Sequence, residues 1–321
     1  MDATYLDPAT WLRHGLLTLS RSDDLRRVLE QAPVSRSVVA RYVPGTGTGD
    51  AVSAASALTE SGRRVTLDHL GEDTRDAQMA GRIRDTYLQL LGALQEAGLT
   101  EDGRVEVSLK LSAIGQALPG DGEQVALEHA RAICERAAAA GTTVTLDMED
   151  HSTVDSTLTI LRALRADFPW VGAVLQSALY RTEGDCRELA HEGSRVRLCK
   201  GAYGGPASAV YQDKREIDLS YVRCLKALMA GQGYPMVATH DPRLVEIAQV
   251  LAARYGRDRD SYELQMLYGI RPDEQRRLAR TGHTVRVYVP YGEEWYGYLM
   301  RRMAERPANA LFFLRSLVST G

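Results

Sequence analysis

From residue 64 onward, short runs rich in β-branched residues alternate with longer segments whose apolar residues recur at helical spacing. Such alternation favours successive βα units and a parallel sheet. The predicted strands are Arg64–Asp68, Val105–Lys110, Thr143–Asp147, Val171–Gln176, Arg195–Lys200, Pro235–Thr239, Tyr262–Gln265 and Thr284–Tyr288. Three of the predicted helices between them span Asp121–Ala140, Ile217–Ala230 and Pro242–Tyr255. Eight such units predict an α/β fold closed into a (β/α)8 TIM-like barrel, rather than an open sheet.

Residues 1–63 precede this regular pattern and are predicted to form an N-terminal helical segment with a loop, while residues 64–321 form the barrel domain. A helix is indicated at Ser22–Glu30, which opens with an N-cap serine followed by acidic residues. The glycine-rich stretch Gly45–Gly49 would need a strand before it to cradle a phosphate, and Arg41–Pro44 is a poor strand. We therefore expect a flexible loop there.

Composition and charge narrow the class of protein. The chain has 321 residues, of which 44% are hydrophobic and 25% charged, as in ordinary globular domains. A net charge of −3 leaves no electrostatic footprint for nucleic acid. The four cysteines are widely spaced, which favours reduced thiols. Without a signal peptide or an apolar run of about 18 residues, the protein is expected to be cytoplasmic or at most peripherally associated with a membrane.

Polar residues end the predicted strands, at the side of a (β/α)8 barrel where active sites lie. They are Asp68, Lys110, Asp147, Gln176, Lys200, Thr239 with His240, Gln265 and Tyr288. One such residue could complete a turn, but a whole ring of them indicates a ligand. Lys110 and Lys200 are the more informative because the chain has only four lysines among its 39 basic residues.

Near the C-terminus, Tyr298, Arg301, Arg302 and Glu305 are spaced so that they share one face of a helix. Two adjacent guanidinium groups suit the recognition of a small carboxylate. Arginine is the default cation of this chain, and the pair Arg276–Arg277 is interpreted as an exposed helix face. The motif alone therefore leaves a solvated face as an alternative.

Taken together, these segments resemble the proline dehydrogenase family. The resembling stretches occur in the expected order: Leu109–Ser112, Leu146–Asp150, Gln176, Arg197–Tyr203, Ala238–Asp241, Leu264–Gly269, Val287–Pro290 and Tyr298–Glu305. The resemblance implies a distorted barrel whose last helix lies over its mouth. It also implies a flavoenzyme that uses FAD to oxidise L-proline to Δ1-pyrroline-5-carboxylate, the first step of proline degradation to glutamate.

The resemblance also implies roles for individual residues. Those expected to bind proline are Lys110, Tyr288, Tyr298, Arg301 and Arg302, with Lys110 and the two arginines on the substrate carboxylate. Those expected to bind FAD are Met148, Gln176, Lys200, Gly201, Ala202, Thr239 and His240. Asp147 and Arg197 correspond to the active-site pair of the family, and no metal is implied. After Tyr203 the sequence Gly204–Pro206 departs from the family pattern, which leaves the detail of that loop open.

The resemblance extends to partners. A quinone or another acceptor would reoxidise the flavin. Because the chain lacks the aldehyde dehydrogenase domain of bifunctional relatives, a separate pyrroline-5-carboxylate dehydrogenase is expected to take the product.

Other readings of the same residues remain open at this point. Asp147–His151 offers carboxylate and imidazole ligands for a metal-dependent hydrolase or aldolase, although most of them cluster in one turn. Lys200 could form a Schiff base in an aldolase. His240 could equally be a core histidine that bonds to a loop carbonyl. The barrel could also oxidise a related cyclic amino acid, or bind a ligand without turnover.

Overall fold

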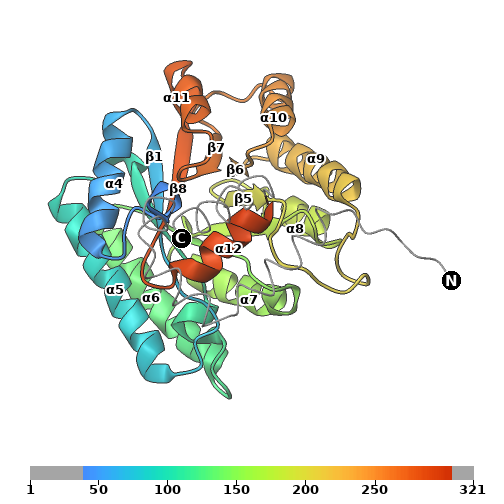
Figure 1. Cartoon of the computed structure of the whole chain (residues 1–321). Helices are drawn as coiled ribbons and strands as arrows, with labels where there is room; N and C mark the ends of the chain where they lie inside the picture. The colour runs from blue at the N-terminus through green and yellow to red at the C-terminus, as the bar shows by residue number, and fades with distance from the viewer. Residues whose placement is uncertain (1–38, 306–321) are drawn as a thin grey trace, which may run out of the picture.

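The computed structural model describes residues 39–305, and these residues form a closed barrel of eight parallel strands arranged in sequence order (Figure 1). The strands are β1 (Arg64–His69), β2 (Val105–Leu109), β3 (Val144–Leu146), β4 (Gly172–Gln176), β5 (Arg195–Cys199), β6 (Tyr234–Ala238), β7 (Glu263–Leu267) and β8 (Val285–Tyr291). Strand β8 pairs with β1 and closes the barrel. The predicted fold is confirmed, and each predicted strand overlaps an observed one.

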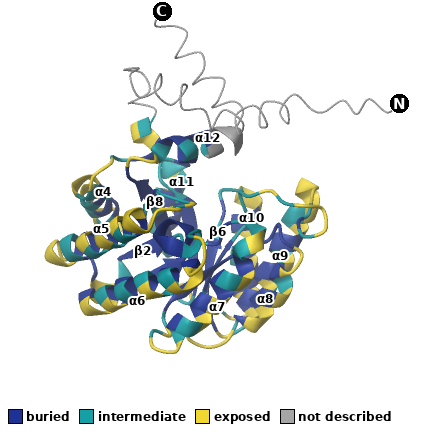
Figure 2. Ribbon diagram, turned by 90° about the horizontal axis from the view of Figure 1, so that it is seen from below, coloured by how far each residue is buried: buried dark blue, intermediate teal, exposed yellow. Residues whose placement is uncertain are grey.

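Helices cover the outside of the barrel, with buried faces turned to the strands and exposed faces turned outward (Figure 2). They are α5 (Ala77–Glu96), α6 (Gly122–Ala140), α7 (Val154–Arg165), α8 (Thr182–Glu188), α9 (Lys214–Ala230), α10 (Pro242–Arg254) and α11 (Pro272–Arg280). In α6, Ala126, Ala130, Ile133 and Ala137 recur at helical spacing and are all buried. Among residues 39–305, no helix is both long and apolar enough to cross a membrane.

Helix α4 (Thr48–Glu60) begins inside the predicted loop at Gly45–Gly49, so Gly45–Gly47 precede the helix as predicted and Thr48 and Gly49 belong to it. Gly47 is its N-cap residue, and Asp50 accepts a hydrogen bond of 3.0 Å from the Gly47 amide. The helix shares one hydrophobic cluster with the barrel through Ala51, Ala55 and Leu58. The division of the chain at residue 63 stays a prediction, and the predicted helix at Ser22–Glu30 lies outside the described residues.

Helix α12 (Trp295–Glu305) lies across the end of the barrel at which the strands terminate (Figures 1 and 2). Its residues Tyr298, Leu299 and Met300 are buried in a second hydrophobic cluster. That cluster includes Leu70, which follows β1, and Ile270, which follows β7. The last helix therefore covers the carboxyl ends of these strands, as the resemblance implied.

Candidate functional site

Asp147 is the centre of the site, and it directly follows β3. Its Oδ1 accepts hydrogen bonds from Arg197 Nη1 at 2.8 Å and from the Ser108 hydroxyl at 2.9 Å. Its Oδ2 accepts a hydrogen bond from the Tyr288 hydroxyl at 2.7 Å. The structure thus brings Asp147 and Arg197 together, as predicted. Ser108 was missed, although its place two residues before Lys110 on β2 puts it on the same face of the strand.

Lys110 joins this centre from the end of β2. Its Nζ lies 2.6 Å from Asp68 Oδ2 and 3.9 Å from Asp147 Oδ2. Burial alone would lower the pKa of Lys110, but the charges of Asp68 and Asp147 outweigh burial and raise it above its usual range. The lysine therefore stays charged, with two carboxylates already beside it. Asp68 was among the predicted strand-end residues but had no predicted role, and it is the carboxylate closer to Lys110.

Tyr288 lies inside β8 rather than at its end, which corrects the predicted strand boundary. It is paired with Leu267 on one side and Thr66 on the other, and β8 continues to Tyr291. Its ring centroid lies 5.2 Å from the Arg197 guanidinium carbon. Burial, reinforced by Asp147, raises the pKa of Tyr288 well above its ordinary value, so its hydroxyl remains a proton donor.

Gln265 is a second correction to the predicted ring of strand-end residues. It lies inside β7, which continues to Leu267. Its amide donates a hydrogen bond of 2.5 Å to Glu263, two residues earlier on the same strand. The side chain therefore belongs to the buried interior of the barrel and not to the mouth.

The residues predicted to bind FAD lie at the end of β4 and just after the ends of β3, β5 and β6, on one side of the barrel mouth. Gln176 Nε2 donates to the carbonyl groups of Met148 at 2.7 Å and Glu149 at 2.9 Å. Gly201 has φ of +103°, and a Cβ atom there would lie 2.9 Å from Gln176 Oε1. Glycine is thus required at this position for both its backbone conformation and its contact with Gln176.

Lys200 and His240 are held by α9, by the N-cap residue of α10 and by β7. Lys200 Nζ lies 2.5 Å from Asp218 and 3.7 Å from Asp241. His240 Nε2 accepts a hydrogen bond of 2.9 Å from the amide of Leu267 on β7, so this nitrogen bonds to a strand amide and not to a loop carbonyl. A Schiff-base role for Lys200 finds no support in this geometry, because a nucleophilic lysine needs to be desolvated rather than paired with carboxylates.

Helix α12 presents Tyr298 and Arg302 to the barrel mouth. Tyr298 is buried, and the Arg302 guanidinium carbon lies 5.4 Å from its ring centroid. This contact holds one predicted carboxylate-binding arginine against the helix. The side chains of Arg301 and Glu305 lie outside the described residues.

Glu149 links two loops at the mouth and was not predicted as a site residue. Its carboxylate accepts hydrogen bonds from the Ser112 hydroxyl at 2.6 Å and from the Ser112 amide at 3.1 Å. Ser112 Oγ in turn accepts a hydrogen bond from the Asp73 amide at 3.0 Å. Burial raises the pKa of Glu149 to about 7, against the lowering effects of Ser112 and Lys110. This carboxyl group therefore titrates near neutral pH.

The titration of Glu149 predicts a pH-dependent stability. Since the folded pKa lies above the usual 4.5, the folded state holds the proton more tightly than the unfolded state. The contribution of Glu149 to the free energy of unfolding is fully present below pH 4.5. It is lost as the pH rises through about 7, which lowers the free energy of unfolding by about 3 kcal/mol. Glu149→Gln should remove this dependence of the free energy of unfolding on pH, as measured by denaturant unfolding at about pH 5 and pH 8. A variant with the pH slope of the original protein would contradict it.

The contacts of Glu149 and Asp150 bear on the alternative reading of Asp147–His151 as a metal site. Glu149 is bound to Ser112, whereas Asp150 accepts hydrogen bonds from the amide and hydroxyl of Ser152. These carboxylates are committed to different partners. Within the described part of the chain, no group of three or more His, Cys, Asp and Glu residues is arranged to hold a metal ion.

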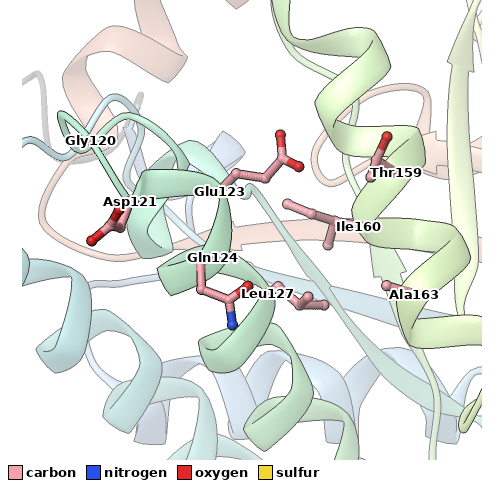
Figure 3. A pocket seen from close by; sticks show the side chains of 8 residues that line it. All are labelled: Gly120, Asp121, Glu123, Gln124, Leu127, Thr159, Ile160 and Ala163. Atoms are coloured by element: carbon pink, nitrogen blue, oxygen red, sulfur yellow. The ribbon is translucent and has the colours of Figure 1, made fainter.

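A groove of about 270 Å³ lies on the outside of the barrel between α6 and α7 (Figure 3). Its lining combines Glu123 and Gln124 of α6 with Thr159 and Ile160 of α7. Neither helix contributes a side chain to the charged cluster around Asp147. The groove is therefore separate from the candidate active site.

Comparison with known proteins identifies the family. The model of the proline dehydrogenase family matches residues 51–315. Proline dehydrogenase 1 of Bacillus subtilis (strain 168) is 38% identical over 96% of this chain and 99% of its own length. Proline dehydrogenase of Deinococcus radiodurans is 37% identical over 95% of this chain and 97% of its own length.

A solved structure extends the comparison to the fold. Proline utilization A from Bdellovibrio bacteriovorus, inactivated by N-propargylglycine, superimposes with a TM-score of 0.77 at 23% identity. The alignment covers 92% of this chain and 36% of that protein, so the chain spans about a third of this larger relative. At that identity the likeness concerns the fold alone. The family model and the two full-length relatives carry the assignment: the chain belongs to the proline dehydrogenase family.

Proposed function

We propose that this protein catalyses the FAD-dependent oxidation of L-proline to Δ1-pyrroline-5-carboxylate, the first step of proline degradation to glutamate. The observation that carries the proposal is the contact of Asp147 with Arg197 and Tyr288 at the barrel mouth, beside Lys110 and beneath α12. The direct test is whether L-proline reduces the FAD-loaded protein in the absence of oxygen.

The residues at the ends of β3 to β6 fit a flavin. Gly201 adopts a positive φ and has no side chain, which leaves the space beside Gln176 unfilled on that face. The residues that would hold FAD are Met148, Gln176, Lys200, Gly201, Ala202, Thr239 and His240. When bound, FAD supplies the acceptor for the hydride that leaves the substrate carbon. Arg197 would provide positive charge at the site, which would favour the acceptance of that negative charge.

The substrate carboxylate needs cations beside it. Four carboxylates and four cations face one another inside the barrel. The carboxylates are Asp68, Glu106, Asp147 and Glu263, and the cations are Lys110, Arg195, Arg197 and Arg286. With all eight ionised, their charges cancel. A buried anion is stabilised by charge-assisted hydrogen bonds from cations, and we propose Lys110 at the end of β2 with Arg301 and Arg302 of α12 for this role.

The substrate amine must lose a proton before the hydride leaves the adjacent carbon. Cations close to an ammonium group lower its pKa because they disfavour a second positive charge. Arg302 would act in this sense on a bound substrate, whereas the charges of Lys110 and Arg197 are balanced by Asp68 and Asp147.

Tyr288→Ser is expected to relax discrimination against 4-hydroxyproline. The Tyr288 hydroxyl is fixed on Asp147 and its ring lies against Arg197, so the ring would wall the pocket around the ring carbons of the substrate. An added hydroxyl would overlap with it, at a cost of about 1–3 kcal/mol or roughly 10- to 200-fold in kcat/KM. The measurement compares kcat/KM for L-proline and trans-4-hydroxy-L-proline in both proteins.

The same comparison separates the proposed substrate from a related cyclic amino acid. If the two proteins show the same ratio, Tyr288 does not line the substrate pocket. A higher kcat/KM for hydroxyproline than for L-proline in the original protein would favour the alternative substrate.

For the cellular context, we propose a cytoplasmic enzyme, at most peripherally associated with a membrane, whose flavin is reoxidised by a quinone or another acceptor. The full-length likeness to two relatives named as proline dehydrogenases supports an enzyme with a single activity. A separate pyrroline-5-carboxylate dehydrogenase would then consume the product. Co-sedimentation with lipid vesicles and the rate of quinone reduction would test the location and the acceptor.

A further inference from the structure

Glu106, on β2, lies one layer deeper in the barrel than the Asp147 centre and is fully buried. Its Oε1 accepts a hydrogen bond from the Thr66 hydroxyl at 2.8 Å. Its Oε2 accepts hydrogen bonds from Arg195 Nη2 at 2.6 Å and from the Thr143 hydroxyl at 2.8 Å. Burial would raise the pKa of Glu106, but the charges of Arg195, Arg286 and Arg197 outweigh it and lower the pKa, so the carboxylate is charged.

Arg197 is held from two sides. Towards the mouth, its Nη1 bonds to Asp147 and to the Ser108 hydroxyl, at 2.8 and 3.0 Å. On the other side, its Nη2 lies 3.5 Å from Glu106 Oε1. Within residues 39–305, Nη2 and Nε of Arg197 are buried without a hydrogen-bond partner. The Glu106 carboxylate is therefore the charge that balances the deep side of this guanidinium group.

We infer that Glu106 is a positioning residue for the reaction: it fixes the Arg197 guanidinium from below and sets how much positive charge Arg197 presents to the flavin and the substrate. The inference rests on the proposed function, because it assumes that Arg197 faces these ligands. Glu106 acts only through Arg197, since Arg197 with Asp147 and Ser108 lies between it and the mouth.

The sign of the effect follows from the charges. With Glu106 neutral, the positive charge of Arg197 would be less compensated, and a reduced, negatively charged flavin would be favoured over the oxidised form. The reduction potential of the bound flavin should therefore rise. A tenfold change in the relative affinity for the two forms corresponds to about 30 mV for a two-electron couple.

The test compares Glu106→Gln with Glu263→Gln, each loaded with FAD. Glu263 is a matched control, because it is also fully buried, bonds to Arg286 at 2.7 Å, and has no contact with Arg197 in the described structure. We expect Glu106→Gln to raise the flavin potential by about 30 mV and to lower kcat more than it raises KM. Glu263→Gln should lower the denaturation midpoint. Its flavin reduction potential, kcat and KM should stay close to those of the original protein.

Thr66→Val provides a second variant in case Glu106→Gln does not fold. Valine keeps the shape of the Thr66 side chain and leaves Glu106 charged, but it removes the hydroxyl that donates to Glu106 Oε1. More negative charge then faces Arg197, so the potential should shift the opposite way, by less than for Glu106→Gln. Equal potentials in Thr66→Val and the original protein, or equal shifts in Glu106→Gln and Glu263→Gln, would overturn the inference. A failure of proline to reduce the original protein would instead contradict the proposed function.

Discussion

Replacing Asp147 by asparagine is expected to lower kcat/KM for L-proline by at least about 30-fold. The carboxylate accepts hydrogen bonds from Arg197, Ser108 and Tyr288 and lies 3.9 Å from Lys110. Removing one partner of a buried, hydrogen-bonded charge pair costs about 2–5 kcal/mol, largely because the remaining charge is left unbalanced. Steady-state kinetics on the FAD-loaded variant gives the value.

An exposed aspartate serves as the control for this change. Asp273 on α11 is 94% exposed and pairs with Arg276 at the surface. Such pairs contribute little, so Asp273→Asn should leave kcat/KM unchanged. Full activity in Asp147→Asn would show that the centre is a structural ion pair, with the reaction carried elsewhere in the barrel.

Replacing Arg302 by alanine should raise KM for L-proline strongly while FAD remains bound. Arg302 lies against Tyr298 on the helix that covers the mouth. The lost contact with a desolvated substrate carboxylate should cost about 2–4 kcal/mol, which is roughly 30- to 800-fold in KM. Flavin absorbance of the purified variant reports whether the cofactor is retained.

Arg276→Ala is the matched control for Arg302→Ala. Arg276 belongs to the arginine pair on α11, and its side chain is 41% exposed in an ion pair with Asp273. Its removal should not change KM. If the two variants behave alike, the α12 pair is a solvated helix face like the one on α11, and another group binds the carboxylate.

The barrel could be predicted from the sequence because its strands are short β-branched runs separated by helical segments. The end of β8 could not, since the run Val287–Tyr291 carries no break before Gly292. Tyr288 was therefore placed at a strand end when it lies three residues inside. In the structure β8 continues through Pro290 beside β1.

The charged interior was also out of reach of sequence reasoning. Glu106, Arg195 and Arg286 alternate with apolar residues along their strands. That alternation shows two faces but not which one is inside, because strands of a parallel barrel are buried on both faces. Similarly, the contact between Glu149 and Ser112 joins two loops 37 residues apart, and no local pattern encodes it.

The most direct test of the account is an anaerobic titration of the FAD-loaded protein with L-proline, followed by flavin absorbance. We expect L-proline to bleach the oxidised flavin within one turnover, and the amount of Δ1-pyrroline-5-carboxylate formed to equal the amount of flavin reduced. Asp147→Asn should bleach far more slowly under the same conditions. An oxidised spectrum that stays unchanged in excess L-proline would contradict the assignment of this barrel as a proline-oxidising flavoenzyme.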